Sequence, residues 1–412
     1  CWFSLIALVS LLSLCWMYIC LVTLNDQDEV NFTQLNLWVN WFMVLIIISA
    51  VLTSYCVLLL LFALFQVVLR EPLNLHWLHK ATGPFLQFGA VGAITLLSPF
   101  IFKGYHAARS KFFIAAVFVV VCAAVLLCPL YIKNQCLCLI EPSDLPDKPK
   151  LIGHRGAPML APENTMMSFQ RSIACGVTAF ETDVQLKDRI PFLMHDHNSG
   201  FLRRTTDVEQ KFPDKIFNHS SDFTWEELQS LNAGEWFPKT DPFRSVWNLS
   251  KEEKNTASNQ TIPSLRQLLK LAQENNISVI FDLYSPDKIL WLPSTKREYV
   301  KKTAPGFIHI YNDSEILKKN NGNYLNVKYS WSLEEIKQQK MDVKVNLWVV
   351  NERWLFSLLW CAGASSVTTN SCHLLKDMER PDLVMAPQTY KIIWITVDIA
   401  SALIMIGICI FH

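Results

Sequence analysis

The chain has 412 residues, of which 51% are hydrophobic and 18% charged, and its formal net charge is +1 at pH 7. This balance of charge gives no reason to expect a nucleic-acid partner, and the hydrophobic fraction is high for a wholly soluble protein. The length allows one good-sized domain together with several membrane spans.

Four apolar runs in the first 132 residues have the composition of membrane spans, at residues 2–24, 41–69, 84–102 and 112–132. A signal peptide is the alternative for the first run, but no basic segment precedes it and no small-residue cleavage pattern follows it. The chain opens with Cys1 rather than Met, so we expect its true N-terminus to be missing. We predict a multi-span transmembrane region over 1–132, a linker over 133–150 and a last span over about 390–411.

Three short apolar runs between residues 151 and 194 each end in residues able to do chemistry. These residues are His154 and Arg155 after the first run, Glu181 and Asp183 after the second, and His195 and Asp196 after the third. Polar groups at the ends of successive short strands, with a helix between the first two, are typical of the mouth of a TIM-type (β/α) barrel. We therefore predict a barrel catalytic domain over residues 151–387.

The residue types in this stretch indicate a particular chemistry. Glu181 and Asp183 lie two apart and share one face of a strand, where their charges repel unless a cation such as Ca²⁺ or Mg²⁺ lies between them. His154 and His195 suit general acid and base catalysis near neutral pH, and Arg155 offers a planar fork for a phosphate. For any one residue a structural role is the commoner explanation, but their convergence favours metal-assisted cleavage of a phosphate ester.

Three motifs carry a family resemblance: H-R-G-A-P-x-x-A-P-E-N-T at 154–165, E-T-D-V at 181–184 and F-L-M-H-D at 192–196. They resemble the signature of the glycerophosphodiester phosphodiesterase family, and the similarity extends over about residues 150–387. The apolar spans and the W-L-F-S-L-L-W-C-A-G run at 354–363 resemble a six-transmembrane animal subgroup.

The resemblance assigns further roles. It places Glu163 in the active-site constellation, whereas the plainer interpretation is a first-turn acid near a helix N-terminus. It makes Asp282 a third metal ligand beside Glu181 and Asp183, one methylene shorter than the glutamate of many members. His195 is then either the acid that protonates the leaving alcohol or a fourth ligand of the single divalent ion.

Other positions depart from the family pattern or allow two roles. Asn370 stands where an acid is common, so no role is assigned to it. This chain has a few more residues than usual after His195, and we expect them to shift Arg203 or Arg204 relative to the metal. Trp236 and Phe237 are candidates for a rim that holds a glycerol or lipid-like group, and core packing is about as good an explanation. Near the metal site, the turn at 187–189 lacks the usual glycine.

The membrane topology contains a conflict. Basic loops at 70–82 and 103–111 should both face the cytosol, yet only one span separates them. The six-span pattern would place another span near residues 80–84, and we infer that this chain lacks it. With that span restored, the catalytic domain lies on the extracellular or lumenal side of the membrane. Simple alternation of the spans in this chain from a cytosolic N-terminus instead places the catalytic domain in the cytosol. Glycosylation sequons favour an extracellular or lumenal domain, at Asn218, Asn248, Asn259, Asn276 and Asn312.

The remaining pattern predicts helices near 165–173, 225–231 and 265–274, and strands at 278–283, 289–293, 307–310, 324–327, 344–350 and 366–368. Only a few residues separate the strands at 278–283 and 289–293, too few for a parallel crossover, so we expect a barrel helix to be missing. Cysteine usage leaves the compartment open, because Cys175, Cys361 and Cys372 fit buried thiols as well as bridges.

Together these features predict a membrane-anchored, metal-dependent phosphodiesterase. It would hydrolyse glycerophosphodiesters, or related lipid head-group diesters, to an alcohol and glycerol phosphate. The expected partners are a small phosphodiester or lipid substrate and the membrane. Two alternatives stay open: an inert membrane receptor or adaptor that keeps the barrel, and phospholipase C-like cleavage of inositol lipids or GPI anchors.

Overall fold

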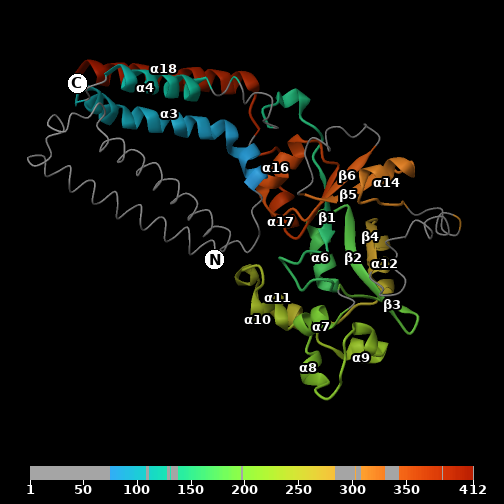
Figure 1. Ribbon diagram of the computed structural model, residues 1–412. Coiled ribbons are helices and arrows are strands. Elements are labelled where there is room, and N and C mark those ends of the chain that lie inside the picture. The colour runs from blue at the N-terminus through green and yellow to red at the C-terminus, as the bar shows by residue number, and fades with distance from the viewer. Residues whose placement is uncertain are drawn as a thin grey trace, which may run out of the picture. The chain divides into compact units, whose positions relative to one another are not determined.

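In a computed structural model, the chain divides into two compact units, one made of Cys1–Leu139 with Met385–His412 and the other of Ile140–Val384 (Figure 1). The structure describes residues 75–107, 111–127, 130, 138–195, 198–283, 302, 308–329, 343–382 and 384–411. The predicted spans at 2–24 and 41–69 and the predicted strand at 289–293 lie outside the described residues, as does the segment where a barrel helix was expected to be missing.

The described residues of the first unit form three long helices: α3 (Leu75–Ala107), α4 (Lys111–Leu126) and α18 (Pro387–Phe411). Helix α3 packs against both of the others (Figure 1). Polar side chains link α3 to α18 within this contact, since Gln87 Nε2 donates a hydrogen bond of 3.3 Å to Asp398 Oδ1.

Only α18, among the described residues, is long and apolar enough to cross a membrane. Helix α4 has 16 residues, so at about 1.5 Å per residue it is shorter than a hydrocarbon core of about 30 Å. Helix α3 also continues through the parts of the predicted basic loops at 75–82 and 103–107, where the loop prediction was wrong. Charge marks the end of an apolar segment rather than the end of a helix, because lysine and arginine are good helix formers.

The second unit is organised around a seven-stranded sheet that curls into half of a barrel (Figure 1). Six strands are parallel and run in the order β4-β2-β1-β7-β6-β5, and β3 pairs antiparallel with β2. The strands are β1 (Lys150–His154), β2 (Ala179–Lys187), β3 (Ile190–Leu193), β4 (Ser278–Leu283), β5 (Tyr324–Lys328), β6 (Lys344–Trp348) and β7 (Ser366–Thr369). This arrangement is the TIM-barrel-like α/β fold expected of the catalytic domain, and β4 begins and ends where predicted.

The turn between β2 and β3 survives without glycine. Asp188 and Arg189 have φ of 50° and 65°, and two successive positive values are those of a type I′ hairpin turn. Aspartate tolerates this conformation better than most residues do. The register remains tight, with Lys187 opposite Ile190.

Helices cover the outer face of the sheet. Phe169 of α6 packs edge-on against Phe180 of β2, with ring centroids 5.2 Å apart. A disulfide joins Cys175, which follows α6, to Cys372, which follows β7, across a Cα–Cα distance of 5.7 Å. The helices next to strands in the chain are α6 (Met166–Ala174), α12 (Leu265–Glu274), α14 (Ser314–Lys319), α16 (Arg353–Cys361) and α17 (Cys372–Leu375), and a 3-10 turn at Pro142–Asp144 precedes β1.

A helical insertion between β3 and β4 has its own hydrophobic core, built around residues such as Phe201, Leu202, Phe223 and Leu228. Its short helix over Trp225–Ser230 confirms the helix predicted at 225–231. The insertion comprises α7 (Ser199–Thr205), α8 (Val208–Lys211), α9 (Trp225–Ser230), α10 (Trp236–Thr240) and α11 (Lys251–Ser258), with 3-10 turns at Ser220–Asp222 and Val246–Asn248.

The strand predicted at 307–310 is wrong for the described residues 308–310, which have no regular structure. The nearby pairing shrinks to one bridge between Tyr311 and Leu325. Two residues after Tyr311, Asp313 caps α14 by accepting hydrogen bonds from the backbone N–H groups of Glu315 and Ile316. The start of this helix prevents the strand from continuing beyond the bridge.

Candidate active site

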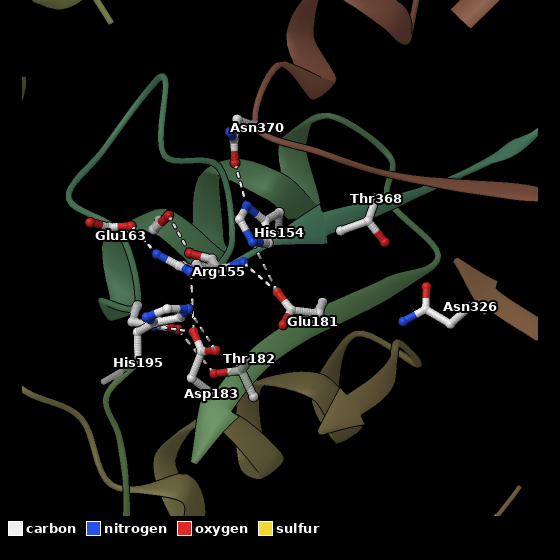
Figure 2. A network of polar contacts seen from close by, with 12 residues as sticks. His154, Arg155, Glu163, Glu181, Thr182, Asp183, His195, Asn326, Thr368 and Asn370 are labelled. Carbon is white, nitrogen blue, oxygen red and sulfur yellow. Dashed lines mark hydrogen bonds and ion pairs between the residues drawn. The ribbon is translucent and has the colours of Figure 1, made fainter. Parts of the chain in front are cut away.

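The predicted functional side chains lie on the inner face of the sheet at the carboxyl ends of β1 and β2 (Figure 2). His154 ends β1 and is in register with Glu181 of β2, while Asp183 is in register with Asp282 of β4. Strand alternation places Glu181 and Asp183 on one face, as the sequence predicted. We call His154, Arg155, Glu163, Glu181 and Asp183 the charged cluster.

A tight turn aims Arg155 into the cluster. Its own φ is 53°, and its backbone N–H donates to both the backbone oxygen and the Oε2 of Glu181, at 3.0 and 3.1 Å. Gly153 and Gly156 make the turn possible. A Cβ on Gly153 would lie 2.6 Å from the carbonyl oxygen of Gly156, and a Cβ on Gly156 would lie 2.5 Å from Ser168 Oγ. The H-R-G motif is therefore a backbone requirement as well as a source of functional groups.

The Arg155 guanidinium lies between two carboxylates. Its Nη1 donates a 2.8 Å hydrogen bond to Glu163 Oε2, and its Nε lies 3.2 Å from Asp183 Oδ2. Glu163 also pairs with Arg204. Burial raises the pKa of Glu163, but the charges of Arg155 and Arg204 outweigh it and hold that pKa below its ordinary value. The acid is thus ionised and bridges two arginines.

Asn164 holds the second strand acid, a role that the sequence analysis missed. Its Nδ2 donates to Asp183 Oδ2 at 2.9 Å, and its Oδ1 accepts from Thr182 Oγ1 at 3.1 Å. The side chain is 2% exposed, and its φ of 57° is one that asparagine tolerates. The E-N-T motif could have indicated this role for Asn164. Thr165 is the N-cap of helix α6, so the start of the helix fixes the position of the residue before it.

His154 is oriented by Asn370, to which the sequence analysis assigned no role. Its Nδ1 donates to Asn370 Oδ1 at 2.6 Å, while its Nε2 lies 3.9 Å from Glu181 Oε2 (Figure 2). Burial, together with the neighbouring charge of Arg155, lowers the pKa of His154 to about 4. The ring is therefore neutral near pH 7 and presents its unprotonated Nε2 to the cluster. The position of Asn370 directly after β7 could have indicated this role, because the functional side chains lie at the carboxyl ends of strands.

His195 follows β3 and approaches from the other side. Its Nε2 lies 3.9 Å from Asp183 Oδ1, and its ring packs against Phe201 of α7 with centroids 5.9 Å apart. The two histidines thus contact different carboxylates of the same strand. This is the flanking arrangement that the sequence predicted.

The insertion contributes a second arginine to the cluster. Arg204 pairs with Glu163 and lies over the rings of Phe201 and Trp236, at 5.0 and 5.3 Å from their centroids. Arg203 instead pairs with Glu209, away from the cluster. Trp236 is half-buried beneath Arg204, whereas Phe237 is fully buried in the insertion, so of the two predicted rim residues only Trp236 lies beside the cluster.

The donor chemistry fits a hard divalent cation. Glu163, Glu181 and Asp183 carry three negative charges against the two of Arg155 and Arg204, and Asp282 adds a carboxylate in register with Asp183. Carboxylate oxygens are the ligands that Ca²⁺ and Mg²⁺ prefer. Among the described residues, however, no three His, Cys, Asp or Glu side chains already stand in a metal-binding group. The described side chains do not include that of Asp282.

Comparison with known proteins identifies a family. Residues 154–396 match the model of the "Glycerophosphoryl diester phosphodiesterase family". The human "Glycerophosphoinositol inositolphosphodiesterase GDPD2" is 39% identical over 98% of this chain and 87% of its own length. The chicken (Gallus gallus) "Glycerophosphodiester phosphodiesterase domain-containing protein 5" is 34% identical over 100% of this chain and 79% of its own length.

The alignment with the human relative spans 472 positions, 60 more than the 412 residues of this chain. That relative therefore has segments of at least this total length that have no counterpart here. Among solved structures, an Oleispira antarctica phosphodiesterase in complex with the product sn-glycerol-3-phosphate has 21% sequence identity and a TM-score of 0.44, over 57% of this chain and 96% of its own.

Proposed function

We propose that this chain, which belongs to the glycerophosphoryl diester phosphodiesterase family and is a phosphoric diester hydrolase, cleaves glycerophosphodiesters or related lipid head-group diesters with the help of one divalent metal ion. The products are an alcohol and glycerol phosphate. The single observation that carries the proposal is the convergence of two imidazoles and an arginine on the Glu181–Asp183 strand face. Members of the family generally use a divalent metal, and the predicted family is confirmed.

Glu181, Asp183 and Asp282 would hold the ion, and His195 is a candidate fourth ligand. Bound there, Ca²⁺ or Mg²⁺ would supply positive charge that stabilises the phosphate oxygens in the transition state. Arg155 would bind the phosphodiester with its guanidinium fork. Glu163 and Arg204 would keep that fork in place, since Glu163 contacts both guanidinium groups.

The histidines would move protons on either side of the phosphorus. His154 would accept the proton of the attacking hydroxyl at Nε2, because its Nδ1 proton is engaged with Asn370. The attacking hydroxyl belongs to water, which gives glycerol phosphate directly, or to the glycerol of the substrate itself, which expels the alcohol and leaves a cyclic phosphate that water then opens to glycerol phosphate. His195 would donate a proton to the oxygen of the leaving alcohol if it is not a metal ligand.

The head group can be proposed from a relative. The human protein of 39% identity is named for glycerophosphoinositol, so we include diesters with an inositol head group among the substrates. Phospholipase C-like cleavage would break the other ester bond and release a phosphorylated head group. The identity of the phosphorylated product therefore decides between the two.

We further propose that the enzyme is a multi-pass integral membrane protein anchored in part by α18, with the catalytic unit on the extracellular or lumenal side. All five sequon asparagines are exposed on the catalytic unit: Asn218, Asn248, Asn259, Asn276 and Asn312. The Cys175–Cys372 disulfide lies in the same unit. Glycosylation and disulfide formation both belong to that side of the membrane. Protease protection and endoglycosidase treatment of intact cells would test this orientation.

The activity is tested with the purified full-length chain in detergent, supplied with Ca²⁺ or Mg²⁺. Glycerophosphocholine, glycerophosphoinositol, a lysophospholipid and a GPI-anchored substrate form the panel. We expect turnover of at least one diester by the wild type and loss of most of it in His154→Ala and in His195→Ala, with unchanged thermal unfolding. Near-normal turnover in both variants would refute the assignment of the histidines. A wild type that turns over none of the panel would favour the inert receptor.

A further inference from the structure

Strands β5, β6 and β7 have an inverted pattern of polarity. Apart from Thr369 at the end of β7, their outward-facing residues are apolar and at most 5% exposed, as at Leu325, Val345, Leu347 and Val367. Lys328, Lys344 and Trp348 lie at strand ends on the inner face. The other inward-facing residues are neutral and polar: Tyr324 and Asn326 on β5, Asn346 on β6, and Ser366 and Thr368 on β7. We call these five residues the polar wall.

Hydrogen bonds join the wall across the strands. Asn346 Nδ2 donates to Asn326 Oδ1 and to Thr368 Oγ1, each at 2.8 Å. Ser366 Oγ donates to Asn346 Oδ1 at 2.8 Å and lies 3.2 Å from the hydroxyl of Tyr324. Asn346 is 1% exposed, so it is the buried centre of the network.

This polar layer is costly to retain in a barrel interior. Burying amides and hydroxyls is unfavourable unless each finds a partner, and apolar groups of the same shape would be about as stable. The neighbouring outward positions show that this chain places apolar residues where helices cover the sheet. A polar inner face therefore indicates that the wall faces something polar.

The wall continues the charged cluster along the same face of the sheet. Thr368 is two residues before Asn370, which holds His154, and Figure 2 shows Asn326 and Thr368 on the same side of the sheet as Glu181. The side chain of Asn326 is half-buried, and its Oδ1 accepts a hydrogen bond from Asn346. The Nδ2 of Asn326 can therefore donate a hydrogen bond to a ligand. No hydrogen bond from this nitrogen to another described residue is present.

We propose that the polar wall binds the hydroxyl groups of a polyhydroxylated part of the substrate through the half-buried amide of Asn326. Thr368, which is 3% exposed, acts as a positioning residue, because it shares the Asn346 amide donor with Asn326. The inference rests on the proposed function, because it assumes a phosphodiester bound at the charged cluster. Amides and hydroxyls both donate and accept hydrogen bonds, as sugar-like hydroxyls require. A quaternary ammonium head group would instead be recognised by aromatic faces or carboxylates. The hydroxyls come either from the glycerol or from a ring such as inositol.

The experiment measures ligand binding to the full-length chain in detergent with Ca²⁺ by calorimetry. The probes are inositol 1-phosphate, glycerol 3-phosphate and inorganic phosphate, which share the phosphate and differ in hydroxyls. The variants are Asn326→Leu, Asn326→Ser and Thr368→Val. If one of them does not fold, the other two still test the inference. The matched control is Asn275→Ala, an exposed asparagine at the end of α12.

We expect the wall variants to weaken binding of at least one hydroxylated probe by about tenfold relative to inorganic phosphate. Weakening of inositol 1-phosphate assigns the wall to the head group, and weakening of glycerol 3-phosphate assigns it to the glycerol. Equal loss for all three probes, or no loss for any, would overturn the inference. A wild type that binds these probes through the wall without hydrolysing any diester would refute the proposed function and leave the wall intact.

Discussion

The two halves of the curled sheet present different chemistry on one continuous inner face. At β1 and β2 the charged cluster places carboxylates beside the guanidinium of Arg155 and the imidazole of His154. On β5 to β7 the polar wall contains amides and hydroxyls and no charge. Charges act strongly on a reacting phosphate, whereas neutral hydrogen-bonding groups discriminate between ligands. The difference suggests that bond cleavage and substrate recognition are divided between the two halves.

The largest effect should come from neutralising an acid of the charged cluster. In Asp183→Asn the shape is kept, but the ion and Arg155 lose a charged ligand. We expect kcat to fall at least 100-fold, together with weaker activation by the metal. Steady-state kinetics across a Ca²⁺ titration measure both. The control is Asp222→Asn, which changes an exposed acid in the same unit. Equal activity in the two variants would contradict the assignment of bond cleavage to the charged cluster.

Asn370 lies where the halves meet, and its loss should give the next largest effect. Asn370→Leu removes the acceptor of the His154 Nδ1 proton, so the ring can adopt the wrong tautomer or turn away. We expect kcat to fall about 10- to 100-fold with little change in KM. Asn370→Asp should restore much of the activity, because it also accepts this hydrogen bond. A change in KM alone would place Asn370 in the recognition half.

Glu163 tests whether the cluster also stabilises the fold. Glu163→Gln leaves two arginines without their common partner, and removing one member of a buried ion pair costs about 3 kcal/mol in the free energy of unfolding. The pKa of Glu163 is lowered in the folded state, so its stabilisation is present above the ordinary value of 4.5 and is lost as the pH falls through the folded value. Urea unfolding of both proteins from pH 7 to pH 3 should show the difference shrinking below pH 4.5. A difference that stays constant would count against the ionised bridge.

The smallest effect on turnover should come from the disulfide that ties the two halves together. Cys175→Ser removes a covalent link between α6 and the segment after β7, which should lower the free energy of unfolding by about 2–5 kcal/mol. Neither cysteine belongs to the cluster or the wall, so kcat at low temperature should change less than twofold. Thermal unfolding and kinetics of Cys175→Ser and Cys372→Ser check both statements. A tenfold loss of kcat would show that the link positions the site.

The sequence predicted the charged half well because charged residues at strand ends are conspicuous. His154, Arg155, Glu181 and Asp183 come together where strand alternation placed them. The polar wall could not be predicted in this way. Asn326 and Thr368 are ordinary strand residues in the sequence, and only the register of the strands shows that they share the inner face. Comparison with the acid common at position 370 assigns Asn370 no role, whereas its side-chain oxygen accepts a hydrogen bond from His154.

Helix ends and membrane segments were less predictable. Apolar runs and charge indicated where the chain changes environment, but α3 continues through the predicted loop residues. Local strand propensity at 308–310 leads only to a single bridge at Tyr311, beyond which α14 begins. Both errors arose because the outcome depends on neighbouring helix formation rather than on the segment itself.

The most direct test is the hydrolysis of glycerophosphoinositol by the purified wild type, followed by phosphorus NMR with Ca²⁺, with Mg²⁺ and with a chelator. We predict that glycerol phosphate accumulates with one of the ions and that the chelator stops the reaction. Turnover that is unaffected by the chelator would contradict a metal held by the charged half, and inositol phosphate as the product would show that the other bond is cleaved.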